Sequence, residues 1–409
     1  MSWPRPPPCR PPPCRTAWWS CWRGAAPAIL RVGAPGQLGS LHWAPLDLAA
    51  PGPGEVALRI EAAGLNFRDL MWAQGLLPEE ALLPGFAGPG LGMECAGIVT
   101  ALGDGAPFRI GDAVFGVAPR ALASHAVTRA EALAPRPAAL DAASAATVPV
   151  AFLTAVHALE ELARIEPGET VLVHGGAGAV GLAALQVALA AGARVAATAG
   201  TPAKRAFLRA AGAALVVDSR DPGFADALRA AWGGQGAGEG CVDVVLNSLA
   251  GDAMERSLGL LKPFGRFLEL GKRDFAENRR VALRPLRRNA IWFAVDVDEL
   301  PRARPALAAR LLRSIAARLA DGTFRPLPAT EFAPEEAEAA FRLLQSSGHI
   351  GKLVLRPPVA DAPGAAARPA PLAGAAGGSV VVVGGTAGFG LEAARWLAAQ
   401  GVRHLALLS

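Results

Sequence analysis

The feature that most constrains the fold is a glycine-rich turn between a short apolar run and an alanine-rich segment. Residues Glu169–His174 and Arg194–Ala199 predict β-strands, and residues 182–193 between them predict a helix. The turn before this helix is a complete G-x-G-x-x-G motif: Gly176, Ala177, Gly178, Ala179, Val180 and Gly181. Such glycines permit the tight turn, the approach of a pyrophosphate and the packing of helix on sheet. We expect a dinucleotide at this helix N-terminus, the alternative being a structural turn.

The strand pattern places this unit in an α/β fold. Further strand candidates at residues 214–217, 242–246 and 266–270 predict a Rossmann-type, doubly wound parallel sheet of six strands. Upstream, residues 29–137 contain short alternating runs such as Glu55–Ile60, which are typical of an antiparallel or barrel-like unit. Two segments are expected to lie outside these domains because of their composition: a disordered proline-rich tail at 1–27 and an Ala/Pro linker at 357–378.

Composition and charge restrict the partners. Hydrophobic residues make up 52% of the chain and charged residues 18%, so most of it can bury a core. The net charge of +5 arises in residues 1–46, which contain five arginines and no acid, so the remaining body is neutral. We therefore expect no nucleic-acid partner. No segment predicts a membrane span or a signal peptide, and the expected location is cytoplasmic.

The end of the second strand bears on which dinucleotide binds. A site that prefers NAD places Asp or Glu there to bind the ribose 2′-hydroxyl, whereas this chain has Thr201, Lys204 and Arg205. A hydroxyl and two cations suit a 2′-phosphate, so the sequence favours NADPH. The alternative is that Lys204 and Arg205 belong to a solvated helix face.

A second polar cluster follows a later strand, where doubly wound folds bind their ligands. Lys272 and Asp274 lie just beyond the strand candidate at 266–270, and they could donate and relay a proton there. On residue types alone, an exposed loop is the more common interpretation of Lys-Arg-Asp.

Six motifs in a fixed order resemble the enoylreductase domain of type I polyketide synthases and fatty acid synthases. They are Asn66-Phe67-Arg68-Asp69, residues 91–97 (LGMECAG), residues 173–181, residues 246–250 (LNSLA), residues 270–274 (LGKRD) and residues 349–352 (HIGK). The resemblance covers about residues 30–356. It implies the medium-chain dehydrogenase/reductase architecture, in which a GroES-like catalytic domain (28–150 and 279–356) is built around a Rossmann domain (151–278).

The resemblance also implies an activity and roles for single residues. Such domains deliver hydride from NADPH to the β-carbon of an enoyl thioester on an acyl carrier protein, and the α-carbon is then protonated. Lys272 and Asp274 match the family's proposed proton donors. Asn66 and Asn247 would line the pocket, and Lys352 would act on the cofactor side.

Two positions bear on metal and on stereochemistry. Met93 stands where zinc-dependent relatives have a histidine ligand, so we expect no metal. Leu77 aligns with a position where tyrosine is associated with S products at an α-methyl carbon. A leucine cannot donate a proton, which predicts an R product; the alternative is that Leu77 only fills an apolar wall.

The C-terminal residues 379–409 resemble the first βαβ unit of a ketoreductase domain, so neighbouring synthase domains are expected partners. The chain contains no tyrosine, the residue that such ketoreductases use in catalysis. Two other interpretations of the whole chain stay open. One is a free-standing quinone or enone oxidoreductase, and the other is a non-catalytic synthase fragment that binds NADPH.

Overall fold

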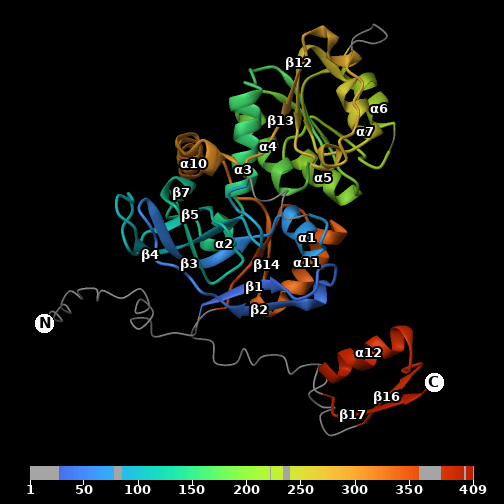
Figure 1. Ribbon diagram of the computed structural model, residues 1–409. Helices are drawn as coiled ribbons and strands as arrows, with labels where there is room; N and C mark the ends of the chain where they lie inside the picture. Colours follow the sequence, from blue (N-terminus) through green and yellow to red (C-terminus); the bar gives the residue numbers. More distant parts are fainter. Residues whose placement is uncertain are drawn as a thin grey trace, which may run out of the picture. The chain divides into compact units, whose positions relative to one another are not determined.

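The computed structural model describes residues 27–77, 85–221, 223–233, 240–358, 379–399 and 402–408. The chain divides into two compact units, residues 1–360 and 361–409, which are described separately (Figure 1). The expected tail at 1–27 and linker at 357–378 lie almost entirely outside the described residues, so both stay predictions.

A parallel sheet forms one half of the first unit, and six strands of it lie among the described residues. Across the sheet they are β10 (Leu215–Val217), β9 (Arg194–Thr198), β8 (Thr170–Val173), β11 (Val242–Asn247), β12 (Leu261–Glu269) and β13 (Ile291–Ala294). The helical connections are α4 (Ala179–Ala190), α5 (Pro202–Ala210), α6 (Phe224–Trp232), α7 (Asp252–Leu258), α8 (Arg273–Ala276) and the 3-10 helix η6 (Arg284–Arg288). This order reverses direction between β8 and β11, where a ligand crevice is expected. The prediction of a Rossmann-type α/β sheet is confirmed.

The parallel sheet extends further along the chain than the sequence suggested. Strand β13 follows residue 278, the expected end of the Rossmann domain, and pairs in parallel with β12 from Arg266↔Ile291 to Glu269↔Ala294. Its four residues, Ile-Trp-Phe-Ala, are too short and too uniformly apolar to show which sheet they join.

The other half of the first unit is a largely antiparallel sheet that uses both ends of the unit. Its order is β14 (Ala329–Phe332), β15 (Lys352–Leu355), β3 (Glu55–Gly64), β4 (Glu94–Leu102), β5 (Ala113–Val117) and β7 (Leu133–Pro135), with β6 (His125–Arg129) paired to β3. The pairs Val354↔Gly64 and Leu355↔Ala63 join β15 to β3. A hairpin of β1 (Ala28–Val32) and β2 (Leu41–Pro45) lies beside this sheet (Figure 1).

Helices connect and cover the two sheets (Figure 1). They are α1 (Phe67–Ala73), α2 (Ala142–Ala146), α3 (Pro149–Val156), α9 (Leu300–Ala303), α10 (Pro305–Ala320) and α11 (Ala337–Ser346), with the π-helix η5 (His157–Leu162) and the 3-10 helices η2 (Leu38–Ser40), η4 (Ala130–Ala132) and η7 (Pro334–Glu336). Every residue of α3 is buried, and this helix packs between α4 and α10 in one apolar core. Among the described residues, no helix is long and apolar enough to cross a membrane.

The second unit contains a single βαβ element in its described part. Strands β16 (Ser379–Val383) and β17 (His404–Leu408) pair in parallel, and α12 (Gly388–Ala399) connects them. Phe389 is 90% exposed and Trp396 57% exposed, so these apolar side chains are left uncovered within the unit.

Candidate active site

The glycine turn packs closely against the parallel sheet and leads into helix α4. Gly178 caps helix α4, whose first N–H groups have no partner within the helix. A Cβ on Gly181 would lie 2.5 Å from Gly175 O, and one on Gly176 would lie 2.9 Å from Ala197 Cβ. At Gly178 the nearest atom would be 3.4 Å away. Gly176 and Gly181 are therefore required for packing, whereas a Cβ at Gly178 would make only an ordinary van der Waals contact.

A buried histidine, not identified from the sequence, holds the strand ends beside this turn. His174 Nε2 lies 2.8 Å from Ser257 Oγ, and its Nδ1 lies 3.2 Å from Thr198 Oγ1. Burial lowers the pKa of His174 to about 3, so the ring is neutral at physiological pH. The imidazole thus joins β8, β9 and α7 without adding charge beside the glycine turn.

The residues expected at the 2′-phosphate occupy different positions around helix α5. Thr201 caps α5 and accepts from the Lys204 backbone N–H at 3.3 Å, while Lys204 Nζ donates to Ser347 O at 2.6 Å. Arg205 is turned to Asp218, with Nη1 and Oδ2 2.6 Å apart. Lys204 therefore lies beside the loop before β15, whereas the charge of Arg205 is compensated.

Two further side chains lie near Lys204, the Arg220 guanidinium and the His349 imidazole, and the sequence predicted neither as a contact of the 2′-phosphate. Burial is the main cause that lowers the pKa of Lys204, and the positive charge of Arg220 lowers it further. Burial also lowers the pKa of His349, with a smaller contribution from Lys204. The Arg220 guanidinium covers Gly200, where a Cβ would lie 2.9 Å from Arg220 Nε. The sequence could have pointed to Arg220, because it lies three positions after the third strand of the sheet. Repulsion between the Lys204 ammonium and the Arg220 guanidinium favours a bound anion.

Asn247 and Glu269 form a buried pair at the carboxyl edge of the parallel sheet. Asn247 Nδ2 donates to Glu269 Oε2 at 2.6 Å and to Leu249 O at 2.8 Å. The other Glu269 oxygen accepts from Gly271 N at 2.6 Å. Burial is the main cause that raises the pKa of Glu269 to about 7. Glu269 was missed, although an acid within the apolar strand sequence FLEL was a signal.

Lys272 and Asp274 bind different partners beyond this pair. Lys272 Nζ donates to Asp296 Oδ2 at 2.8 Å and to Val295 O at 3.3 Å, and the Lys272 side chain is 51% exposed. Asp274 Oδ2 accepts from Gly251 N at 3.0 Å, at the start of helix α7. The structure thus brings both to the same edge of the sheet, but no described contact joins them.

Asn66, Glu94 and Lys352 form a compact polar group, which we call the Asn66–Glu94–Lys352 triad. Lys352 Nζ donates to Asn66 Oδ1 at 2.8 Å and forms an ion pair with Glu94 Oε1. Asn66 Nδ2 donates to the same Glu94 oxygen at 2.8 Å. Glu94 was not a candidate in the sequence. The Lys352 ammonium is directed toward the expected pocket residue Asn66.

The triad adjoins the glycine turn (Gly176–Gly181) through Gly351, the residue before Lys352. Gly351 N donates to Ala177 O at 2.9 Å, and Gly178 and Gly351 form an isolated β-bridge. Leu77 is half-buried and directly precedes residues 78–84, which lie outside the described ranges, so its expected pocket position stays a prediction.

The described residues around Met93 and Cys95 do not supply the ligands of a zinc ion. Among the described residues, no group of three or more His, Cys, Asp or Glu side chains is placed to hold a metal. Burial raises the pKa of Cys95 to about 12, which disfavours the thiolate that binds zinc. Glu94, the neighbour of Cys95 on β4, is already paired with the Lys352 ammonium from β15.

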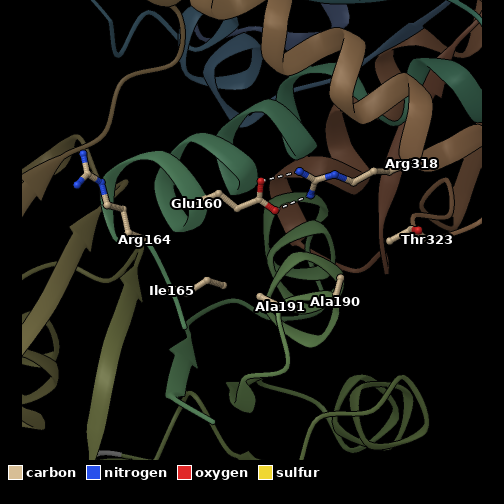
Figure 2. A pocket seen from close by; sticks show the side chains of 7 residues that line it. All are labelled: Glu160, Arg164, Ile165, Ala190, Ala191, Arg318 and Thr323. Atoms are coloured by element: carbon tan, nitrogen blue, oxygen red, sulfur yellow. Dashed lines mark hydrogen bonds and ion pairs between the residues drawn. The ribbon is translucent and has the colours of Figure 1, made fainter. Parts of the chain in front are cut away.

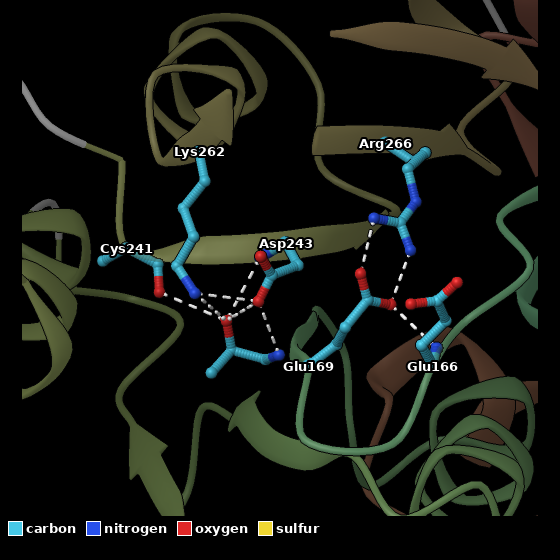
Figure 3. A network of polar contacts seen from close by, with 7 residues as sticks. Glu166, Glu169, Cys241, Asp243, Lys262 and Arg266 are labelled. Carbon is cyan, nitrogen blue, oxygen red and sulfur yellow. Dashed lines mark hydrogen bonds and ion pairs between the residues drawn. The ribbon is translucent and has the colours of Figure 1, made fainter. Parts of the chain in front are cut away.

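Two features at the amino edge of the parallel sheet lie away from this chemistry. A pocket of about 620 Å³ lies beside the ends of η5 and α4, where Arg318 Nη2 donates to Glu160 Oε2 at 2.7 Å (Figure 2). In a polar network, Lys262 binds Asp243 at 2.8 Å and Arg266 binds Glu169 at 2.6 Å (Figure 3). These ion pairs join β8, β11 and β12 at the ends opposite the glycine turn, where they stabilise the sheet.

Comparisons with known proteins agree with this fold. Residues 52–136 match the family model of the alcohol dehydrogenase GroES-like domain, residues 211–355 that of zinc-binding dehydrogenases, and residues 378–409 that of the KR domain. The phthioceranic/hydroxyphthioceranic acid synthase of Mycobacterium tuberculosis is 39% identical over 391 residues, which cover 93% of this chain and 18% of the relative. The chain thus spans less than a fifth of the length of this curated relative.

Several solved structures match this chain over their whole length. The CurK enoyl reductase is 36% identical with a TM-score of 0.72, and the JamJ enoyl reductase is 32% identical with a TM-score of 0.73; each covers 82% of this chain and is itself covered completely. Mycobacterial Rv1454c, solved in complex with NADPH, is 26% identical with a TM-score of 0.69, over 81% of this chain and all of that one.

The two sheets, the glycine turn and the catalytic half built from both ends of the first unit define an oxidoreductase of the medium-chain dehydrogenase/reductase superfamily. Within it, the chain belongs to the enoylreductase family of polyketide synthases, and a segment matching the KR domain follows.

Proposed function

We propose that this chain uses NADPH to reduce the carbon–carbon double bond of enoyl thioesters carried on an acyl carrier protein. The observation that carries the proposal is the contact between Gly351 N and Ala177 O. This contact joins the start of β15 to the glycine turn, and Lys352, the first residue of β15, binds Asn66. A ligand at the turn and a thioester beside Asn66 would then meet where the two sheets join. Membership of the enoylreductase family supports this assignment.

The choice of NADPH is supported by the cations near the end of β9. The Arg220 guanidinium lies close enough to Lys204 to lower its pKa, and Asp218 is already paired with Arg205. A 2′-phosphate would relieve the repulsion between Lys204 and Arg220, whereas the hydroxyl of NADH would not. The NADPH complex of the similar Rv1454c agrees with this choice.

The proposed reaction divides the work between the cofactor and the protein. NADPH, when bound, supplies a hydride to the β-carbon of the substrate. Lys272 then donates a proton to the α-carbon, with Asp274 assisting. Because Lys272 and Asp296 are 51% and 48% exposed, their ion pair is weak, and Nζ can turn from Asp296 toward a substrate.

The reaction proceeds without zinc in this proposal, because Met93 stands where zinc-dependent relatives have a histidine ligand. Neighbouring synthase domains would supply the carrier, in keeping with the length of the polyketide synthase relatives. With Leu77 near the pocket, an α-methyl substrate is expected to give the R product.

The test is NADPH oxidation by the purified full chain with crotonyl-pantetheine, with a small quinone and without acceptor, each after dialysis against a chelator. Turnover on the thioester that survives dialysis supports the proposal. Turnover on the quinone alone would assign a free-standing quinone reductase instead. Tight NADPH binding with no turnover on either acceptor would assign a non-catalytic fragment.

A further inference from the structure

The triad fixes the orientation of the Asn66 amide by chemistry. An ammonium group only donates hydrogen bonds and an ionised carboxylate only accepts them. Lys352 Nζ therefore requires Asn66 Oδ1 opposite it, at 2.8 Å, and Glu94 Oε1 requires Asn66 Nδ2, also at 2.8 Å. A flipped amide would place its NH₂ group against the ammonium and its oxygen against the carboxylate. The positions of Oδ1 and Nδ2, which an isolated asparagine can interchange, are therefore fixed here.

Burial keeps the two charged partners in place. Glu94 is 0% exposed and Lys352 3% exposed. The second Glu94 oxygen accepts from Val150 N, at the start of α3, at 2.7 Å. Gly64 makes room for the group, because a Cβ there would lie 2.8 Å from both Glu94 Oε1 and Lys352 Cε. Water therefore cannot replace either partner of the Asn66 amide.

One N–H of Asn66 makes only a long hydrogen bond within the protein and can turn to a ligand. Glu94 accepts the first amide hydrogen at 2.8 Å, and Gly64 O accepts from Asn66 Nδ2 at 3.5 Å, the outer limit of a hydrogen bond. Asn66 is also half-buried, whereas its two partners are enclosed. The triad adjoins the glycine turn through Gly351, so this donor lies where substrate and cofactor are proposed to meet.

We infer that Glu94 and Lys352 are positioning residues that hold Asn66 as a hydrogen-bond donor to the thioester carbonyl oxygen. This inference rests on the proposed function. When hydride adds to the β-carbon, the electron pair of the double bond shifts toward the α-carbon and the carbonyl oxygen, which gains negative charge. A donor fixed beforehand at that oxygen stabilises the transition state more than the ground state.

The experiment uses the full chain with butyryl-pantetheine labelled with ¹³C at its carbonyl, bound in the presence of NADP⁺ and followed by difference infrared spectroscopy. In the unmodified protein, the carbonyl band should move to lower wavenumber than in buffer. Asn66→Ala should lose this shift and lower kcat on crotonyl-pantetheine by about 10²–10³-fold, with the NADPH dissociation constant unchanged.

The positioning residues are tested together, because removing one alone would leave a buried unpaired charge. Glu94→Gln/Lys352→Met should lose most of the band shift, and adding it to Asn66→Ala should lower kcat no further. The matched control is Glu61→Gln/Arg136→Met, another ion pair of this half of the fold, with 3.0 Å between its charged atoms, which should keep both shift and kcat. Lys352→Arg, which keeps a buried donor, should retain part of the shift if the double variant does not fold.

The outcomes separate the inference from the proposed function. A bound thioester whose carbonyl band is the same in the unmodified protein and in Asn66→Ala would overturn the inference and leave reduction intact. Additive losses of kcat in the triple variant would overturn the positioning role of Glu94 and Lys352. Failure of any thioester to bind would refute the proposed function and the inference with it.

Discussion

Asn247 and Glu269 end neighbouring strands and are joined by a 2.6 Å hydrogen bond from Asn247 Nδ2 to Glu269 Oε2. Both side chains are buried, and the carboxylate is bound by an amide and a backbone N–H. The pair lies at the base of the loop that carries Lys272 and Asp274, so it fixes where that loop leaves the sheet.

This pair predicts a pH-dependent stability. The pKa of Glu269 in the folded protein is about 7, above its usual 4.5, so the folded state holds the proton more tightly than the unfolded state. The stabilisation of the folded state by protonated Glu269 is complete below about pH 4.5. It is lost as the pH rises through about 7, because the buried side chain then loses its proton. Between pH 5 and pH 8, urea unfolding should show the unmodified protein losing about 1–3 kcal/mol more stability than Glu269→Gln. Parallel pH profiles of the two proteins would contradict this.

Lys272→Ala should lower turnover on an enoyl thioester by about 10²–10⁴-fold, because general-acid help in protonating the α-carbon is lost. NADPH affinity should change little. Arg273→Ala is the matched control, since Arg273 is the adjacent cation and is 74% exposed in a pair with Glu277. Steady-state kinetics and cofactor titration of both variants provide the check. A fully active Lys272→Ala protein would show that Lys272 has no catalytic role and belongs to an ordinary exposed loop.

The cation cluster predicts unequal effects of three substitutions on cofactor choice. Lys204→Ala and Arg220→Ala should each weaken NADPH binding by about 1.5–3 kcal/mol, the value of one charge-assisted contact, and leave NADH unchanged. Arg205→Ala should have a smaller effect because Asp218 holds that guanidinium at 2.6 Å. Dissociation constants from NAD(P)H fluorescence are the measurement. Equal constants for NADPH and NADH in the unmodified chain would refute the preference.

Two glycines of the turn should respond differently to alanine. Gly181→Ala places a Cβ 2.5 Å from Gly175 O, so it should lower the melting temperature as well as cofactor affinity. At Gly178 the nearest protein atom is 3.4 Å away, so Gly178→Ala should weaken NADPH binding with little change in melting temperature. Calorimetry and cofactor titration distinguish the two. A loss of melting temperature in Gly178→Ala as large as in Gly181→Ala would contradict the distinction.

Local sequence patterns predicted the elements that carry their own periodicity or punctuation. The turn from Gly176 to Gly181 lies between β8 and α4, and the closing strand near Lys352 is β15. Strand β13 was not assigned to the parallel sheet, because its four residues have no periodicity of their own and pair only through tertiary contacts.

Site residues that act through distant partners were harder to find. Glu94 is separated from Lys352 by more than 250 positions along the chain, and only the pairing of β15 with β3 brings the two sides together. Arg205 follows the second strand, where the sequence predicts a phosphate contact, yet its guanidinium binds Asp218 instead. Arg220 approaches Gly200 only because β10 lies beside β9. Such contacts depend on strand order, which one sequence does not display.

The most direct test of the proposed reaction follows isotopes through a single turnover. The full chain is incubated with crotonyl-pantetheine and NADPH carrying deuterium at either face of C4, in ordinary water, and the butyryl product is examined by mass spectrometry and NMR. The account predicts deuterium from one face only, located at the β-carbon, and a solvent proton at the α-carbon. Deuterium at the α-carbon, or recovery of unreduced thioester with the label still on the cofactor, would contradict it.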